Sequence, residues 1–281
     1  MKVLADEAHG THFYFGEDLP VSAMAAGADI AAVSMHKSGG SLTQSSLLLT
    51  NKNVRWEYVA QIINLTQTTS ASYLLMSSLD ISRRNLALRG KESFGKVMKM
   101  AEYARNEINE IGGYYAYGRE LNNGSSVFDY DITKLSVYTR DIGLAGIEVY
   151  DLLRDEYDIQ IEFGDIGNIL AYISIGDRIQ DIERLVGALA DIKRLYSKDN
   201  AKMLSMEYIP PIVSATPRDA FYADKEMLPI EQTTGRICSE FVMCYPPGIP
   251  ILSPGEMITD EIIEYINYAK AKGCSMQGTE D

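Results

Sequence analysis

Two residues that could act together in catalysis stand near the start of the sequence, in the segments ADEAHG and VSMHKSGGSLTQ. Lys37 follows His36 and precedes a pair of glycines, and Asp6 comes about thirty positions earlier. A lysine whose pKa is lowered by burial and by its neighbours becomes a nucleophile that forms an imine with a carbonyl. Hydroxyls, a histidine and the N–H groups of a glycine-rich turn can bind phosphate. This combination favours pyridoxal phosphate, against the alternative of a solvated surface lysine.

Asp6 suits a second requirement of that cofactor. Pyridoxal phosphate accepts electrons when its ring nitrogen is protonated, and a carboxylate paired with that nitrogen keeps the proton there. Ala8 is small enough for a flat ring to lie against it, and His9 could reach the cofactor or a substrate carboxylate. His12 has no such function, and we expect it to be structural, packed with the segment THFYF near the entrance of the site. The alternative for Asp6 is a strand-end aspartate that only caps a turn.

Short strands and helices must position these residues. In the first part of the chain, hydrophobic patterning predicts strands at 3–6, 29–34 and 47–49 and helices at 23–26, 54–65, 73–85 and 91–111. This alternation predicts an α/β sheet with its functional groups at strand ends. A strand that carries chemistry as the first element would leave an open apolar edge, which proteins avoid. The sequence is therefore typical of the later part of a larger fold.

Composition divides the rest of the chain. We expect strands at 131–139 and 159–163, a turn at 163–168, and helices at 146–155, 179–196 and 259–272. Thr259 is the expected N-cap of the last helix, and Gly273 is its expected stop. Eight of the nine prolines lie between Pro210 and Pro254, which indicates a compact module with many turns. The predicted domains are 1–117, 118–203 and 204–281.

Charge and composition exclude several classes of partner. The chain is 46% apolar and 23% charged, as in globular proteins, and its net charge of −13 argues against nucleic acids and anionic membranes. Cys238, Cys244 and Cys274 have no CxxC spacing, so we expect neither a disulfide framework nor a zinc site. They are interpreted as buried or incidental thiols in a reducing cytoplasm. We find no signal peptide and no apolar run near the ~18–20 residues that span a bilayer.

Four segments carry a family resemblance: ADEAHGTHFYF, SMHKSGGSLTQSSLL, QTTSASYLLMSSLD and GRICSEFVMCYPPGIPILSPGE. With them the chain resembles, over essentially its whole length, the bacterial ornithine/lysine/arginine decarboxylases. It is most similar to the shorter, arginine-decarboxylase-like branch. The resemblance implies an α/β fold: a partial sheet domain like that of aspartate aminotransferase (pyridoxal phosphate fold-type I), then a small α/β lobe and a C-terminal α+β module.

The resemblance also implies a contact with the cofactor for each matching residue. These residues are Lys37, Asp6, Ala8, His9, Ser34, His36, Thr68, Thr69 and Ser70. Lys37 would hold the cofactor covalently, Asp6 would pair with the ring nitrogen, and Ala8 and His9 would lie against the ring, so Lys37, Asp6 and His9 are the candidate catalytic residues. Ser34 and His36 would help to hold the phosphate.

More distant residues are implied by the resemblance as well. The hydroxyl run Thr68-Thr69-Ser70 would reach the cofactor of the other subunit in a dimer, although Ala71 stands where family members often have proline. Glu256 would help to shape the mouth of the site. No metal is implied.

The activity implied is pyridoxal phosphate-dependent decarboxylation of a basic amino acid, with arginine, giving agmatine, favoured over lysine and ornithine. The expected assembly is a homodimer or a higher oligomer. The family also carries, before the matching point, the rest of the cofactor domain, so the chain is expected to be a truncated enzyme, a split enzyme completed by a separate chain, or a decayed paralogue. The functional alternatives are a non-catalytic or regulatory subunit and another pyridoxal phosphate reaction such as amino transfer.

Overall fold

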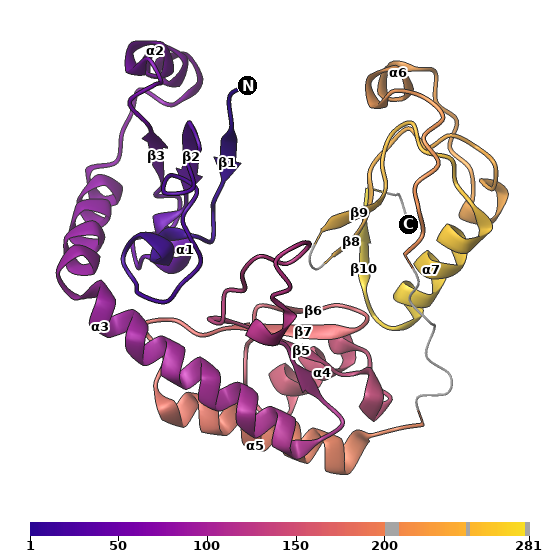
Figure 1. Cartoon of the computed structure of the whole chain (residues 1–281). Helices are drawn as coiled ribbons and strands as arrows, with labels where there is room; N and C mark the ends of the chain where they lie inside the picture. Colours follow the sequence, from indigo (N-terminus) through magenta and orange to yellow (C-terminus); the bar gives the residue numbers. More distant parts are fainter. Residues whose placement is uncertain (200–207, 246–247, 279–281) are drawn as a thin grey trace. The chain divides into compact units, whose positions relative to one another are not determined.

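The computed structural model describes residues 1–199, 208–245 and 248–278 (Figure 1). The chain divides into two compact units. Unit 1 is Met1–Tyr103, Gly118–Thr133 and Ile173–Ile179, and unit 2 is Ala104–Tyr117, Lys134–Tyr172 and Gln180–Asp281. Among the described helices, none combines the length and the apolar character that crossing a membrane requires.

The sheet of unit 1 has three strands in the order β1-β2-β3, and all three predicted strands are confirmed. β1 (Leu4–Asp6) pairs in parallel with β2 (Ile30–Val33), and β2 pairs antiparallel with β3 (Leu47–Thr50). Side chains alternate between the two faces. Ala31 and Val33 are buried, whereas Ala32 between them is exposed. One face of the sheet therefore forms a core and the other stays open.

Short elements follow the strands at the edge that carries the candidate residues. η1 (Thr11–Tyr14) comes after β1, and α1 (Met35–Ser38) comes directly after β2. The helix predicted at 23–26 is wrong, because this segment forms only turns. Ala28 N bonds Ala23 O and Gly27 adopts a φ of 96°, so the chain turns away before a helical nucleus can extend.

Two helices complete the main part of unit 1. α2 (Trp56–Thr66) confirms the helix predicted at 54–65, and it buries none of its residues. The helices predicted at 73–85 and 91–111 are instead one continuous helix, α3 (Tyr73–Ile111), which Figure 1 shows as an uninterrupted ribbon. The helix continues through Gly90. Glycine fits at this position because Phe15 packs too closely for a side chain: a Cβ at Gly90 would lie 2.8 Å from Phe15 Cβ.

The larger sheet of unit 2 is antiparallel, with the order β4-β5-β7-β6. Its strands are β4 (Tyr115–Ala116), β5 (Lys134–Tyr138), β6 (Phe163–Gly164) and β7 (Asn168–Tyr172). The strand predicted at 131–139 is confirmed. The strand predicted at 159–163 begins only at Phe163, because the preceding segment is held against the end of a helix by Ile159 N bonding Leu153 O. The sequence analysis missed β4 and β7.

The helices of unit 2 match their predicted ranges closely. α4 (Gly146–Asp155) packs against β6 and β7. α5 (Ile179–Tyr196) buries one apolar stripe, as an amphipathic helix does. Other short helices among the described residues of unit 2 are α6 (Pro217–Tyr222) and the 3₁₀ turns η3 (Arg140–Ile142) and η5 (Ile230–Gln232), whereas the 3₁₀ turn η2 (Arg119–Leu121) belongs to unit 1.

The last part of unit 2 is a small sheet of order β10-β8-β9 with one long helix. The strands are β8 (Val242–Tyr245), β9 (Ile249–Leu252) and β10 (Ser275–Gln277), and the helix is α7 (Asp260–Ala271). The predicted cap is confirmed, because Thr259 Oγ1 accepts a hydrogen bond from Ile262 N at 3.4 Å. Gly273 follows the helix with a φ of 95°.

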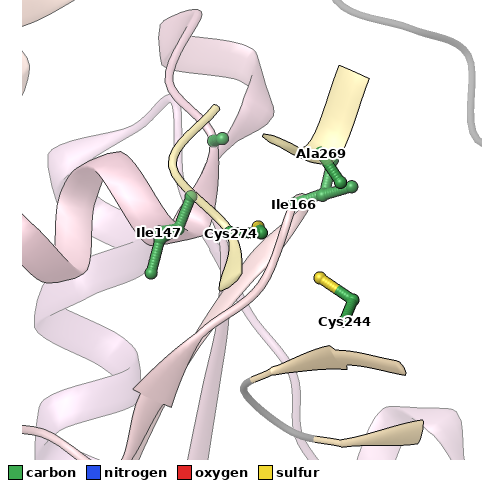
Figure 2. Close-up of a cluster of buried hydrophobic side chains, with 6 residues drawn as sticks. Ile147, Ile166, Cys244, Ala269 and Cys274 are labelled. Atoms are coloured by element: carbon green, nitrogen blue, oxygen red, sulfur yellow. The ribbon is translucent and has the colours of Figure 1, made fainter. Parts of the chain in front are cut away.

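A cluster of buried side chains connects several elements of unit 2 (Figure 2). Its members are Ala145, Ile147, Ile166, Cys244, Ala269 and Cys274. The cluster draws on α4, the β6–β7 turn, β8 and α7, so these elements share one core. The domain boundary predicted at 117/118 remains a prediction, and the one predicted at 203/204 lies outside the described residues.

Candidate functional site

Lys37 lies in α1, one turn of helix directly after β2, rather than in an open loop. Its side chain is exposed, and its Nζ lies 3.3 Å from Nε2 of His9. His9 follows β1, so two successive strand ends bring these groups together. Because an ammonium group can only donate, His9 Nε2 accepts the hydrogen bond when Lys37 is charged. The pair can therefore hold or exchange a proton between Nζ and Nε2.

Asp6 ends β1 and faces the open side of the sheet. Its Oδ1 accepts a hydrogen bond from Ala8 N at 3.2 Å, so the carboxylate does close a turn, as the alternative interpretation requires. The side chain nevertheless stays exposed. Asp6 pairs across the sheet with Ala32, which is also exposed and which in turn pairs with Leu48. The small Ala32 side chain leaves open space beside the carboxylate, and the sequence analysis missed this residue, although the alternation of β2 could have identified it.

His36 is oriented by the backbone. Its Nδ1 lies 3.0 Å from the carbonyl oxygen of Ser45, and since a carbonyl only accepts, Nδ1 carries the hydrogen. The neutral ring therefore presents Nε2 as an acceptor, and Nε2 donates only when the ring is protonated. Ser34 uses its carbonyl to accept from Thr11 Oγ1 at 3.2 Å and from Lys37 N at 3.1 Å. These bonds fix the end of β2 against η1 and α1.

Ser38 adds a polar atom that the sequence analysis did not single out. Its side chain is 5% exposed, and its Oγ has no hydrogen-bond partner among the described residues. Buried hydroxyls usually have a hydrogen-bond partner, so Ser38 Oγ is unusual in lacking one among the described residues.

His12 is not part of this group. It is fully buried, and its Nε2 lies 2.8 Å from Asp131 Oδ2. Its ring packs against Phe13 and Phe94, with centroid separations of 4.5 and 5.7 Å. Its surroundings are those of a core residue, as the expected structural role requires.

Glu7 is a second neighbour that holds the local structure. Its Oε1 accepts from Ala23 N at 2.8 Å and its Oε2 accepts from the Tyr14 hydroxyl at 2.5 Å. Burial, together with the hydrogen bond to the Glu7 carboxylate, raises the pKa of Tyr14 to about 12. The Tyr14 hydroxyl therefore stays protonated and keeps the segment after β1 in place.

The other residues implied by the resemblance lie elsewhere. Thr68, Thr69 and Ser70 are exposed in the connection between α2 and α3, where Ser70 N donates to Thr68 Oγ1 at 3.1 Å. Glu256 belongs to unit 2, where its Oε2 accepts from Ser253 N at 2.9 Å and closes its own turn. Pro246 and Pro247 of the PPGIPILSPGE segment lie outside the described residues.

Unit 2 has a cavity of its own, of about 640 Å³, which the sequence did not predict. Its lining includes Tyr138, Arg140, Asp165, Asn168, Cys244 and Tyr265. Burial raises the pKa of Tyr265 to about 12, so this hydroxyl is a neutral donor or acceptor at the cavity wall.

Comparison with known families covers nearly the whole chain. The model of the Orn/Lys/Arg decarboxylase major domain matches residues 1–181, and the model of the Orn/Lys/Arg decarboxylase C-terminal domain matches residues 200–280. Two curated relatives are an arginine decarboxylase of Bacillus anthracis and one of Bacillus subtilis. Each is 44% identical over 99% of this chain. The chain spans 57% of the first protein and 58% of the second, a little over half of each.

Solved structures give the same fold. The lysine decarboxylase of Francisella novicida matches with a TM-score of 0.77 at 18% identity, covering 98% of this chain and 51% of its own. A lysine decarboxylase of Pseudomonas aeruginosa matches with a TM-score of 0.74 at 18% identity, covering 96% and 49% of the two chains. At this identity the likeness concerns the fold alone, and it agrees with the predicted α/β class. The two family models together establish that the chain belongs to the Orn/Lys/Arg decarboxylase family.

Proposed function

We propose that this chain carries the catalytic lysine of a pyridoxal phosphate-dependent decarboxylase that acts on a basic amino acid, with arginine as the first candidate. The proposal concerns the assembled enzyme, because the chain spans only 57% of a curated relative. One observation carries it: Lys37 Nζ lies 3.3 Å from His9 Nε2, at the strand ends where β1 terminates in Asp6.

The groups at this edge fit one end of the cofactor. Lys37 has an exposed amine that can bind the cofactor aldehyde, and Asp6 has an exposed carboxylate that can hold a proton on the ring nitrogen. Ala8 and Ala32 are small side chains next to that carboxylate, which suits a flat ring. When bound, the cofactor supplies a ring that stabilises negative charge on the carbon that loses carbon dioxide.

The phosphate end is supported by fewer groups. Ser34 and His36 are the proposed ligands, and the buried Ser38 hydroxyl without a partner is a further candidate. Because His36 Nδ1 is held by Ser45 O, His36 would donate to a phosphate oxygen only from a protonated Nε2. We therefore propose that further phosphate donors come from outside these residues, from a second chain or from the rest of the cofactor domain.

Lys37 and His9 would move protons in the reaction. His9 Nε2 can take the proton of the Lys37 ammonium, which leaves the amine as a nucleophile. In the later step the same pair can return a proton to the substrate carbon that has lost its carboxylate. The Asp6 carboxylate would pair with the ring nitrogen and favour a proton there by its negative charge.

Arginine is favoured as substrate by the 44% identity to proteins named arginine decarboxylases, with lysine and ornithine as alternatives. The net charge of −13 suits a cationic substrate in general terms. We place the enzyme in the cytoplasm, in keeping with the three free cysteines.

We also propose that unit 1 is covered by a second polypeptide, first of all a second copy of the chain. α2 exposes Trp56, Tyr58, Ile62 and Leu65 at 52–75% each. Such a concentration of exposed apolar side chains is typical of an interface. The exposed run Thr68-Thr69-Ser70 follows α2 directly, so the same contact would carry these hydroxyls to the partner's cofactor.

The test is reduction of the purified native assembly with borohydride after incubation with pyridoxal phosphate, followed by peptide mapping. We expect the label on Lys37, loss of the label in Lys37→Arg, and retention in the control Lys52→Ala, which changes another exposed lysine of unit 1. Release of carbon dioxide from arginine, lysine and ornithine then ranks the substrates.

Labelling of a different lysine in the wild-type assembly would contradict the assignment of Lys37. An assembly that takes up no cofactor would support the non-catalytic subunit instead. Transfer of the amino group without release of carbon dioxide would support amino transfer.

A further inference from the structure

Two of the three cysteines meet inside unit 2. Cys244 lies in β8 and Cys274 lies between α7 and β10, and both belong to the buried cluster of Figure 2. β10 pairs with β8 so that Met276 faces Cys244, and Cys274, two positions before Met276, lies on the same side of the sheet. In Figure 2 the Cys244 sulfur points toward Cys274, and a side-chain hydrogen bond joins the two thiols.

The hydrogen bond makes the two thiols unequal. The Cys274 thiol donates to Cys244, which lowers the pKa of the Cys244 thiol although burial acts to raise it. The same bond, together with burial, raises the pKa of Cys274. The geometry also distinguishes the two thiols, because Cys244 lines a cavity whose lining does not include Cys274. The thiolate is the nucleophilic form of cysteine.

Cys244 is also accessible to a small molecule from one side. It lines the cavity of about 640 Å³ in unit 2, next to Tyr265 and Asp165. A hydroperoxide can enter a space of that size, whereas a protein thiol cannot approach a side chain that is 7% exposed. The cavity thus selects small oxidants over bulky ones.

We propose that Cys244 and Cys274 form an oxidisable dithiol, which hydroperoxides convert into an intramolecular disulfide. Cys244 attacks one peroxide oxygen, the O–O bond breaks, and an alcohol or water leaves with the thiol proton. Cys274 then attacks the Cys244 sulfur, the S–S bond forms, the S–O bond breaks, and water leaves with the second proton. The two thiols together lose two electrons and two protons, and the peroxide is reduced.

Cys238 provides a matched control within the same unit. It is buried to the same degree, but its Sγ donates to the backbone carbonyl of Glu240 at 3.1 Å rather than to a thiol. Burial raises the pKa of Cys238. Cys238 also lines a cavity, of about 500 Å³, but the buried cluster around it contains no second thiol among the described residues, so it is expected to form no disulfide when the other two thiols react.

The proposal is tested on the full chain treated with hydrogen peroxide, with intact mass and non-reducing peptide mapping as the readouts. We expect the mass of two hydrogen atoms to be lost, one thiol to remain titratable, and one cross-linked peptide pair that contains Cys244 and Cys274. Dithiothreitol should restore all three thiols. Persistence of all three free thiols, or a cross-link that involves Cys238, would overturn the proposal.

Two variants separate the steps. Cys274→Ser should stop the reaction at a sulfenic acid on Cys244, which dimedone traps, whereas Cys238→Ser should still form the disulfide as the wild type does. Peroxide should also raise the Tm of the wild type and of Cys238→Ser but not that of Cys274→Ser, because a cross-link restricts the unfolded chain. Equal labelling of Cys238 and Cys244 by dimedone in Cys274→Ser would contradict a selective site.

Discussion

Helices in the two units of this chain differ in how far they bury their apolar side chains. In unit 2, α5 buries Ile182, Leu185, Ala188, Leu189 and Ile192 in one stripe. In unit 1, α2 is an apolar helix of similar type that buries no residue at all, and α3 exposes Tyr73, Leu74 and Ile81. Unit 2 thus buries the apolar stripe of α5, whereas unit 1 leaves the apolar side chains of α2 and of the beginning of α3 exposed.

The same contrast holds for the candidate site. In unit 1 Lys37, His9 and Asp6 all lie exposed at the open face of the sheet. In unit 2, Arg140 and Asp165 line a cavity, and Glu148 pairs with Lys198 and Lys272. The groups of unit 1 would bound the proposed cofactor site on one side only. This openness supports the proposal that another polypeptide completes the site of unit 1.

The largest expected effect concerns the open face of unit 1. Asp6→Asn keeps an acceptor for Ala8 N and removes only the charge that would hold a proton on the cofactor ring. We expect kcat of the native assembly to fall by about a thousandfold, roughly 4 kcal/mol, while cofactor absorbance is retained. Asp80→Asn, which alters an exposed ion pair on α3, should leave kcat unchanged. Wild-type turnover in Asp6→Asn would remove the proposed role.

The second prediction compares two leucines directly. Leu189 on α5 is fully buried and Leu65 on α2 is 75% exposed. Leu189→Ala should lower the free energy of unfolding by about 2–5 kcal/mol, because it removes buried contacts and leaves a cavity. In the monomer, where α2 is not covered by a partner, Leu65→Ala should change it by less than about 0.5 kcal/mol. Urea unfolding of the two variants measures both values, and equal costs would break the comparison between the units.

The third prediction concerns the uncovered helix. Ile62 is 54% exposed on α2, and Ile62→Asp should weaken self-association by about tenfold, or ~1.4 kcal/mol, because the proposed interface would then bury a charge. The control is Leu195→Asp on α5, which changes a leucine that is 55% exposed in unit 2. Sedimentation velocity over a concentration series measures both. Equal weakening by the control would show that α2 is not specifically involved.

The smallest effect belongs to Glu148 in unit 2. Burial acts to raise the pKa of Glu148, but bonds from Ala145 N, Lys272 and Lys198 outweigh it and lower the pKa below 4.5. A depressed pKa contributes stability above about pH 4.5 that is lost as the pH falls through the folded value. Because Glu148 is partly solvated, Glu148→Gln should cost less than about 1 kcal/mol at pH 7, and the cost should be smaller at pH 3, where more of the carboxylate is protonated.

Urea unfolding of the wild type and Glu148→Gln at both pH values tests this prediction. A stability difference that is as large at pH 3 as at pH 7 would contradict the assigned cause. Glu92→Gln alters an exposed pair with Lys96 on α3, and it should change the pH dependence less.

Local patterns predicted much of the fold. The strands at β1, β2 and β3 and the helices α4, α5 and α7 follow from alternation, helical periodicity and the Thr259 cap, all of which act over a few residues. The continuous α3 could not be predicted, because Gly90 is tolerated only where Phe15 packs closely against it. β4, β7, β8, β9 and β10 were missed, since a strand depends on its pairing partners as much as on its own residues.

The candidate site, like the fold, could be predicted only in part from the sequence. Residue types and spacing along the sequence identified Lys37, Asp6 and His9, because each follows a strand and strand ends collect functional groups. The sequence could not show that Lys37 contacts His9, that Ser45 sets the tautomer of His36, or that His12 turns inward to Asp131. Each of these contacts joins residues that are separated in the sequence and that come together only in the folded chain.

The sequence by itself determined the family and the α/β class, and it proposed the lysine and aspartate of the candidate site, because these depend on residue type and on short-range order. Only the tertiary structure decided that Cys244 lies beside Cys274, that Ser38 is buried with no hydrogen-bond partner among the described residues, and that α2 buries none of its residues. The physical reason is that burial and contact are properties of the packed chain, and packing sets which side chains lose water.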